Sequence, residues 1–189
     1  MKQDIIAITT KYLSPKELAY RLRCMAVLDI IMNSEEDAWL RLVQKYSSEK
    51  EAYQIRNGSG DEMDIFFEEN GVFIRGFDHE NNLNQFASDA WDESFFADTY
   101  AGVPKNFLDI YKEECWKQNI TVGNDGGKDY LLDFICDDAE AWVEWAKDYY
   151  EVEIDFHIVE KVFKGSRLTE EEICQLNPKR DAKAALEEI

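Results

Sequence analysis

The sequence predicts an α+β fold, in which an antiparallel sheet of hairpins packs against an N-terminal helix and C-terminal helices. Apolar residues recur at helical spacing after Ser14 and again beyond Asp137. Between these segments, short apolar runs alternate with polar residues and are separated by turns rich in Gly and Asn, as in antiparallel strands. The chain has 189 residues, of which 45% are hydrophobic, enough for one core. We therefore expect a single domain over residues 1–189, mostly sheet over 37–136 with a helical insertion near 86–111, and helical over 138–188.

The first helix is predicted to begin after Ser14. This serine is a typical N-cap, because Pro15 follows at the first helical position and Glu17 stands where a capping box has its carboxylate. Helical spacing then relates five apolar residues, which are Leu18, Leu22, Met25, Ala26 and Ile30.

The next segment, residues 35–46, is compatible with two kinds of structure. A helical stripe and a strand-like alternation both account for its apolar residues. Turn-like residues at 47–50, followed by an apolar run at 52–55, favour a strand that begins a meander. Both alternatives remain open at this point.

Residues 60–80, GDEMDIFFEENGVFIRGFDHE, predict a β-hairpin. Asn70-Gly71 is a typical two-residue loop, because a type I′ turn needs positive φ at both positions. Strands are then expected over 62–69 and 72–79, with Glu62 opposite His79. Alternation places an apolar set on one face, namely Met63, Ile65, Phe67, Val72 and Ile74.

The other face of this hairpin mixes aromatic rings with charged groups. Apolar anchors within a charged rim are typical of protein-binding surfaces. We therefore predict that a partner is bound by Asp61, Glu62, Asp64, Phe66, Phe73, Arg75, Phe77, Asp78, His79 and Glu80. The alternative is a sheet face that a C-terminal helix covers, with the acids at its margin.

An enzyme is the rival interpretation of the same residues. A small-molecule or metal-dependent active site would be centred on Asp61, Glu62, Asp64 and His79. However, the chain has two histidines and no HExxH, GxSxG or GxGxxG motif. We therefore predict no catalytic residues, no metal and no cofactor, and we expect His157 to be a surface histidine.

Later elements follow from similar signals. Pro104 is expected to open a short helix, and a second hairpin is expected to turn at residues 124–127 and return along 130–136. Helices are then predicted after Asp137-Asp138, over residues 154–163 and after the capping box that begins at Thr169. In the first of these, a stripe of Trp142, Trp145 and Tyr149 predicts core residues. A frayed, charged tail is expected after Pro178.

The formal net charge is −19 and the isoelectric point is about 4.4. Such a chain repels phosphate backbones and anionic membranes, so we expect no nucleic-acid or membrane partner. It suits a basic protein partner, which it would attract electrostatically. The first residues contain no long apolar run of a signal peptide, so a cytoplasmic protein is expected.

The segment RNGSGDEMDIFFEENGVFIRGFDHE, residues 56–80, resembles a signature of a family of acidic bacterial proteins. The matching positions are Asn57, Gly58, Ser59, Gly60, Asp61, Gly71, Ile74, Arg75, Gly76, Phe77, Asp78, His79 and Glu80. AEAWVEWAKDYYEVEID and LTEEEICQLNP near the C-terminus are also similar. The resemblance implies an α+β fold and no particular activity. In size and acidity the chain is also similar to immunity proteins of bacterial toxin systems, so a non-enzymatic protein-binding module is expected.

Overall fold

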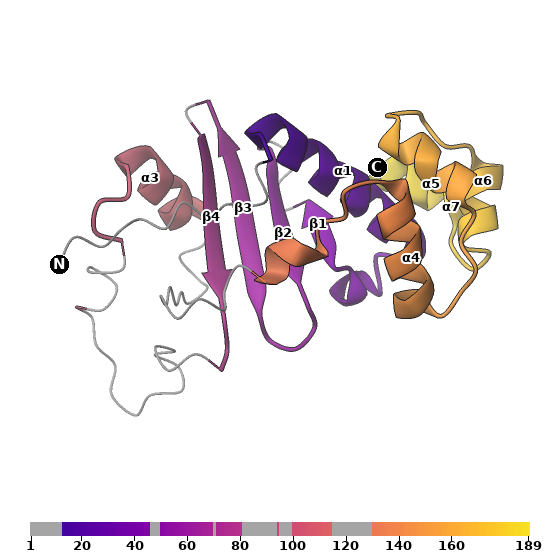
Figure 1. Ribbon diagram of the computed structural model, residues 1–189, viewed down its shortest axis with the longest axis horizontal. Coiled ribbons are helices and arrows are strands. Elements are labelled where there is room, and N and C mark those ends of the chain that lie inside the picture. The colour runs from indigo at the N-terminus through magenta and orange to yellow at the C-terminus, as the bar shows by residue number, and fades with distance from the viewer. Residues whose placement is uncertain (1–12, 46–49, 70, 81–93, 95–99, 115–129) are drawn as a thin grey trace.

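The computed structural model describes residues 13–45, 50–69, 71–80, 94, 100–114 and 130–189 (Figure 1). For residues 110–114 it describes the backbone alone. Within these residues the fold is α+β, as predicted. The elements are α1 (Pro15–Met32), η1 (Ala38–Leu40), β1 (Val43–Lys45), β2 (Ala52–Arg56), β3 (Glu62–Glu68), β4 (Gly71–Phe77), α3 (Lys105–Glu114), η3 (Tyr130–Phe134), α4 (Ala139–Tyr150), α5 (Phe156–Phe163), α6 (Glu170–Leu176) and α7 (Ala182–Glu188).

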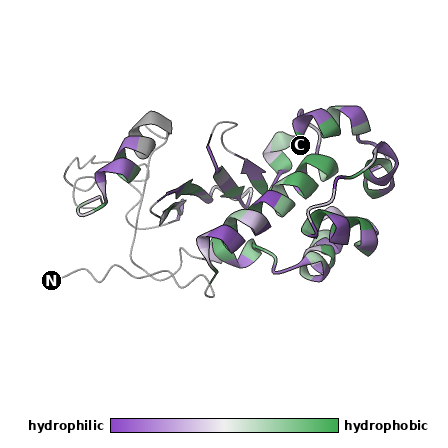
Figure 2. Cartoon of the chain, turned by 90° about the horizontal axis from the view of Figure 1, so that it is seen from above, coloured by the Kyte–Doolittle hydropathy of each residue, from purple (hydrophilic) through white to green (hydrophobic). Residues whose placement is uncertain are grey.

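Helix α1 is the centre of the molecule. Its N-terminus is capped as predicted, since the Ser14 hydroxyl accepts the Glu17 N–H (3.2 Å) and Pro15 occupies the first turn. It lies between the sheet and the helices α5, α6 and α7, and it contacts β1 on one side and these helices on the other (Figures 1 and 2). Its buried residues therefore surround the helix, and they include Leu22, Met25, Leu28 and Ile31.

The four strands form an antiparallel meander in the order β1-β2-β3-β4. One face of the sheet packs against the main core through the apolar set that the sequence predicted. Helix α3, whose start after Pro104 is confirmed, lies at the β4 side (Figure 1).

The register of the β3–β4 hairpin differs by two residues from the predicted one. Glu68 pairs with Gly71, and Glu62 pairs with Phe77 instead of His79. This register places the Asp64 carboxylate opposite Arg75 and lines up two pairs of similar side chains, which are Ile65 with Ile74 and Phe66 with Phe73. A shift of two residues leaves every side chain on its predicted face. Gly71 is the first residue of β4, and Asn70 lies outside the described residues.

Two further segments correct the sequence predictions. The strand favoured for residues 35–46 is confined to Val43–Lys45, and the 3₁₀ helix η1 precedes it. Residues 130–136 were expected to form a returning strand, but Tyr130–Phe134 is the 3₁₀ helix η3. The rest of that predicted hairpin, and the ring-rich residues 86–96 apart from Ser94, lie outside the described residues.

The C-terminal third is helical as predicted. Asp138 caps α4 through the Ala141 N–H (2.9 Å), and Thr169 and Glu172 form the predicted capping box of α6. The tail is not frayed, because α7 is capped by Asp181 and the Arg180 guanidinium donates to the Ile30 carbonyl in α1 (2.9 Å). Within the described ranges, no helix combines the length and apolarity that crossing a bilayer requires.

Candidate functional site

The turn between β2 and β3 is built around the Asn57 side chain. Its Oδ1 accepts the N–H groups of Ser59 (2.8 Å) and Asp61 (3.3 Å), as in an Asx-turn. Gly58 and Gly60 have φ of +74° and +101°, a region that other residues rarely adopt. This turn places the Asp61 carboxylate beside His79, just after the end of β4.

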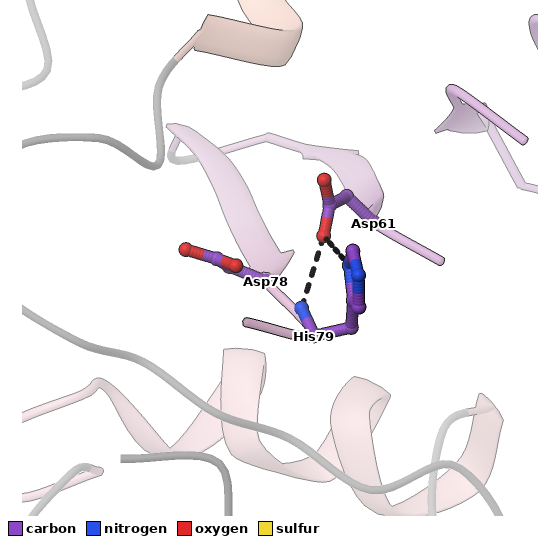
Figure 3. A group of neighbouring side chains, drawn as sticks. All are labelled: Asp61, Asp78 and His79. Atoms are coloured by element: carbon purple, nitrogen blue, oxygen red, sulfur yellow. Dashed lines mark hydrogen bonds and ion pairs between the residues drawn. The ribbon is translucent and has the colours of Figure 1, made fainter. Parts of the chain in front are cut away.

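Asp61 is the hub of this site (Figure 3). Its Oδ1 accepts two hydrogen bonds from His79, one from the backbone N–H (2.9 Å) and one from ring Nδ1 (2.7 Å). Its Oδ2 accepts hydrogen bonds from Asn57 Nδ2 (3.0 Å) and from the Tyr130 hydroxyl in η3. Four donors from three segments therefore converge on one carboxylate, and we call this group the Asp61 cluster: Asn57, Asp61, His79 and Tyr130.

The Asp61 cluster has shifted titration properties. Partial burial tends to raise the pKa of Asp61, but hydrogen bonds from Tyr130, His79 and Asn57 outweigh it and lower that pKa to about 2. The hydrogen bond to Asp61 raises the pKa of His79. Burial and the same carboxylate raise the pKa of Tyr130. Asp61 is therefore charged at neutral pH, and its hydrogen bond with His79 favours the protonated form of that ring.

Asp61, Asp78 and His79 are the residues that could hold a divalent cation. Each offers one ligand atom, and these atoms lie within 4.8 Å of one another. In Figure 3 the dashed lines join Asp61 with His79, while the Asp78 carboxylate accepts the N–H of Glu80 (3.0 Å). A cation bound at Nδ1 would displace the hydrogen bond that Nδ1 now makes with Asp61, and whichever ring nitrogen binds the cation must be unprotonated. The hydrogen bond to Asp61 is present without any such change.

The second sheet face carries a row of polar side chains across three neighbouring strands. Gln54, Asp64 and Arg75 lie opposite one another and are all buried. Asp64 accepts hydrogen bonds from Gln54 Nε2 (2.7 Å) and Arg75 Nη1 (2.6 Å). Burial raises the pKa of Asp64, although Arg75 opposes the change. Glu62 lies nearby, 3.6 Å from Arg75 Nη2, and burial and Asp64 raise its pKa.

The four residues of the predicted acidic active site thus fall into two groups. Asp61 and His79 belong to the Asp61 cluster, whereas Glu62 and Asp64 pair with Arg75 on the sheet. Tyr130, 69 residues from Asp61, completes the first group, and no local pattern in the sequence indicated it.

The aromatic anchors that the sequence predicted on the second hairpin face are partly covered. Phe66 is buried and stacks on Phe73 (ring centroids 6.1 Å), which stacks in turn on Phe107 of α3 (5.6 Å). The expectation of a C-terminal helix over this face is also corrected, since the contact comes from α3. Of the ten predicted partner-binding residues, three are buried (Asp64, Phe66, Arg75), five are half-buried (Asp61, Glu62, Phe73, Phe77, Asp78) and two are exposed (His79, Glu80). Their partner-binding role stays a prediction.

A buried acid in α1 escaped the sequence analysis. Asp29 is fully buried, and its carboxylate accepts the Val43 N–H (2.7 Å) and the Tyr150 hydroxyl (2.6 Å). The Asn33 side chain donates to the same hydroxyl (3.1 Å). Burial raises the pKa of Asp29 to about 7. An acid inside the apolar run from Cys24 to Met32 was the signal that could have indicated it.

Exposed aromatic rings occur elsewhere, where η1 meets the end of α4. Trp39 is 69% exposed, and Tyr149 is 46% exposed. The prediction that the α4 stripe is core holds for Trp142, which is fully buried, and fails for Tyr149. The Tyr149 hydroxyl donates to the Leu40 carbonyl (3.2 Å), which ties the two elements together.

Neither the Asp61 cluster nor the aromatic rings of η1 and α4 acquires a role by analogy with known proteins. A scan against protein-family models and searches of curated proteins and of solved structures gave no match for this chain.

Proposed function

We propose that this protein is a non-enzymatic, cytoplasmic binding module that presents an acidic surface to a basic protein, as an immunity-type antitoxin would. The observation that carries the proposal is the charge of the segment from α4 to α5. Between Asp137 and Glu160 the only lysine is Lys147, whereas the acids are Asp137, Asp138, Glu140, Glu144, Asp148, Glu151, Glu153, Asp155 and Glu160. The first seven of these acids are exposed.

The acids of the hairpin differ from those of α4 in being bonded within the chain. Asp61 and Asp64 accept hydrogen bonds from His79 and Arg75, so their charges stabilise the fold. Among the described residues, the α4 acids Glu140, Glu144 and Asp148 have no comparable ties. Of the other exposed acids in this segment, Asp137 pairs with Arg21, Asp138 caps α4 and Glu153 lies 3.7 Å from Lys147. Such acids attract a basic partner over several ångströms and accelerate association, while apolar anchors slow dissociation.

Capture from the native host tests the proposal. The immobilised full chain is expected to retain one stoichiometric protein of basic isoelectric point, and raising NaCl is expected to slow its association. Replacing Glu140, Glu144 and Glu153 by Gln should slow association in the same way. A partner that is not basic, or an association rate that does not respond to salt, would contradict the proposal.

A metal-dependent function is the second candidate, and the spacing of Asp61, Asp78 and His79 favours it. Equilibrium dialysis with Zn²⁺ and Mn²⁺ tests it, because imidazole and carboxylate ligands suit both ions. One ion per chain, lost in His79→Ala and retained in His157→Ala, would support this candidate. Equal weak binding by all three proteins would remove it.

A further inference from the structure

An exposed aromatic surface lies where η1 meets the C-terminal end of α4. It consists of Trp39, Leu40 and Tyr149, with Glu35, Glu36 and Asp37 immediately before it in the chain, and we call these six residues the Trp39 surface. All six are exposed. Trp39 has the largest exposed fraction of the exposed large hydrophobic residues. Tryptophan at this exposure is unusual in a folded domain, where its ring normally contributes to burial.

The Trp39 surface is held in place by hydrogen bonds. In η1, the Leu40 N–H donates to the Asp37 carbonyl (2.9 Å), and the Gln44 side chain donates to the Ala38 carbonyl (2.8 Å). Ser34 Oγ donates to the Asp37 carboxylate (3.1 Å). The backbone that carries Trp39 is thus a hydrogen-bonded turn, so little backbone entropy is lost when a partner contacts it.

Tyr149 extends this fixed surface onto α4. Its ring stacks on Trp145 (centroids 4.7 Å) and meets Tyr150 edge-on (4.9 Å), while its hydroxyl is bonded to η1. Tyr150 in turn is tied to the buried Asp29 (2.6 Å). The Tyr149 ring is therefore supported by a chain of contacts that leads back to the core, as in preorganised interface anchors.

We infer that the Trp39 surface is the docking site for an arginine-bearing segment of the basic partner, an inference that rests on the proposed function. Trp is the best ring acceptor for a cation, and Arg stacks on aromatic faces while its N–H groups pair with carboxylates. The three consecutive acids that directly precede η1 in the chain supply those carboxylates.

Charge complementarity selects this occupant over the others. In a two-fold dimer of this chain the same patch would meet itself, so the acids Glu35, Glu36 and Asp37 of both copies would lie in one interface. Like charges placed together in an interface are unfavourable. An anionic lipid surface would be repelled by the same acids. A cationic protein segment satisfies both the rings and the carboxylates.

The test uses the full chain and an acetylated nona-arginine peptide as the probe. The chain has five tryptophans, so its indole N–H groups can be followed separately by NMR, with Trp39→Phe providing the assignment. At low salt, the Trp39 indole is expected to shift most on titration. Binding by Trp39→Ala/Tyr149→Ala and by Glu35→Gln/Glu36→Gln/Asp37→Asn is expected to weaken at least fivefold (about 1 kcal/mol).

The matched control is Glu69→Gln/Glu170→Gln/Glu171→Gln, which removes the same charge at exposed positions outside both the Trp39 surface and the segment from α4 to α5. This control is expected to weaken binding less than twofold. Equal losses in the two charge triples, or full binding by the double aromatic variant, would overturn the inference and leave the acidic-surface proposal standing. Failure of the peptide to bind at low salt would overturn the inference as well. A concentration-dependent dimer that Trp39→Ala abolishes would replace the basic segment with a second copy.

Discussion

At the scale of single residues, Asp29 has the most demanding environment. It is a fully buried acid in the core. Both described donors to its carboxylate, the Val43 N–H and the Tyr150 hydroxyl, are uncharged. Burial raises its folded pKa to about 7, whereas an unfolded chain would show about 3.8. Between these values the folded state keeps a proton that the unfolded state has released. Stability is therefore expected to fall as pH rises from about 4 to about 7.

Asp29→Asn is expected to remove this pH dependence. The amide keeps an acceptor for the Val43 N–H, and its NH₂ can donate to the Tyr150 hydroxyl. Between pH 5 and 8, urea unfolding should show the variant gaining stability relative to the wild type, by up to about 3 kcal/mol at about 1.4 kcal/mol per pH unit. Glu187→Gln removes the same charge at an exposed position and is the control. An unchanged slope in Asp29→Asn would assign the pH dependence to other groups.

The buried Asp64–Arg75 pair makes a second prediction at this scale. Arg75→Met leaves the Asp64 carboxylate buried with Gln54 as its remaining donor among the described residues, so the free energy of unfolding should fall by about 3–5 kcal/mol. Asp64→Leu/Arg75→Met removes both charges and should recover most of that loss. Denaturant unfolding of the two variants measures the difference. If the double variant is as unstable as the single one, the charges are needed for more than their mutual pairing.

At the scale of elements, the β2–β3 turn explains why two glycines are not equivalent. Both have positive φ, so alanine at either position strains the backbone. A Cβ on Gly60 would also lie 3.2 Å from His79 Cγ, whereas a Cβ on Gly58 would meet open space. Gly58→Ala should therefore cost about 1 kcal/mol, and Gly60→Ala more, because the His79 ring must move from Asp61.

Thermal unfolding of the two alanine variants, together with the His79 ring resonances, checks this prediction. Gly60→Ala should bring the His79 titration closer to that of a free imidazole, since the Asp61 hydrogen bond raises its pKa. Gly58→Ala should leave the His79 resonances as in the wild type. Equal stability loss with no change at His79 would show that the ring is not held against Gly60.

Elements with local signals could be predicted from the sequence. Ser14 and Thr169 mark helix starts because a cap and its partner lie within four residues. Pro104 marks another, since it directly precedes α3. The hairpin faces were predicted because alternation survives a register shift of two. The register itself was not, since it depends on which side chains meet across the strands, Asp64 with Arg75 above all.

The candidate site was only partly predictable for the same reason. Asp61 and His79 were expected to lie near each other, because both flank the hairpin. Their direct pairing, and the contribution of Tyr130, depend on contacts between segments far apart in sequence. Tyr130 also lies in a segment predicted as a strand, so its hydroxyl could not have been placed. Trp39 was missed because neither pattern available for residues 35–46 leaves it exposed on a fixed turn.

At the scale of the whole molecule, the charge of −19 is the dominant feature. Ion pairs bring opposite charges together at specific points, as where Arg21 joins Glu17 and Asp137 and where Glu188 joins Arg41 and Arg180. The Arg21 pair with Asp137 links α1 to the start of α4, and the Glu188 pair with Arg41 links α7 to the residue after η1. The exposed acids of α4 remain close together, and their mutual repulsion is greatest in the compact state.

Salt is therefore expected to stabilise the fold. Raising NaCl from about 0.05 M to about 0.5 M shortens the screening length to a few ångströms, which weakens repulsion among exposed acids more than it weakens partly buried ion pairs. The melting temperature should rise by about 2–4 °C, equivalent to about 1 kcal/mol for a chain of this size. Chloride is the appropriate anion, because sulfate would stabilise the fold through its exclusion from protein surfaces.

Glu140→Gln/Glu144→Gln/Glu153→Gln should melt higher than the wild type at low salt and gain less from added NaCl. A melting temperature that falls with NaCl would mean that attraction in pairs such as Arg21–Glu17 outweighs the repulsion, and the charge of α4 would then cost the fold nothing.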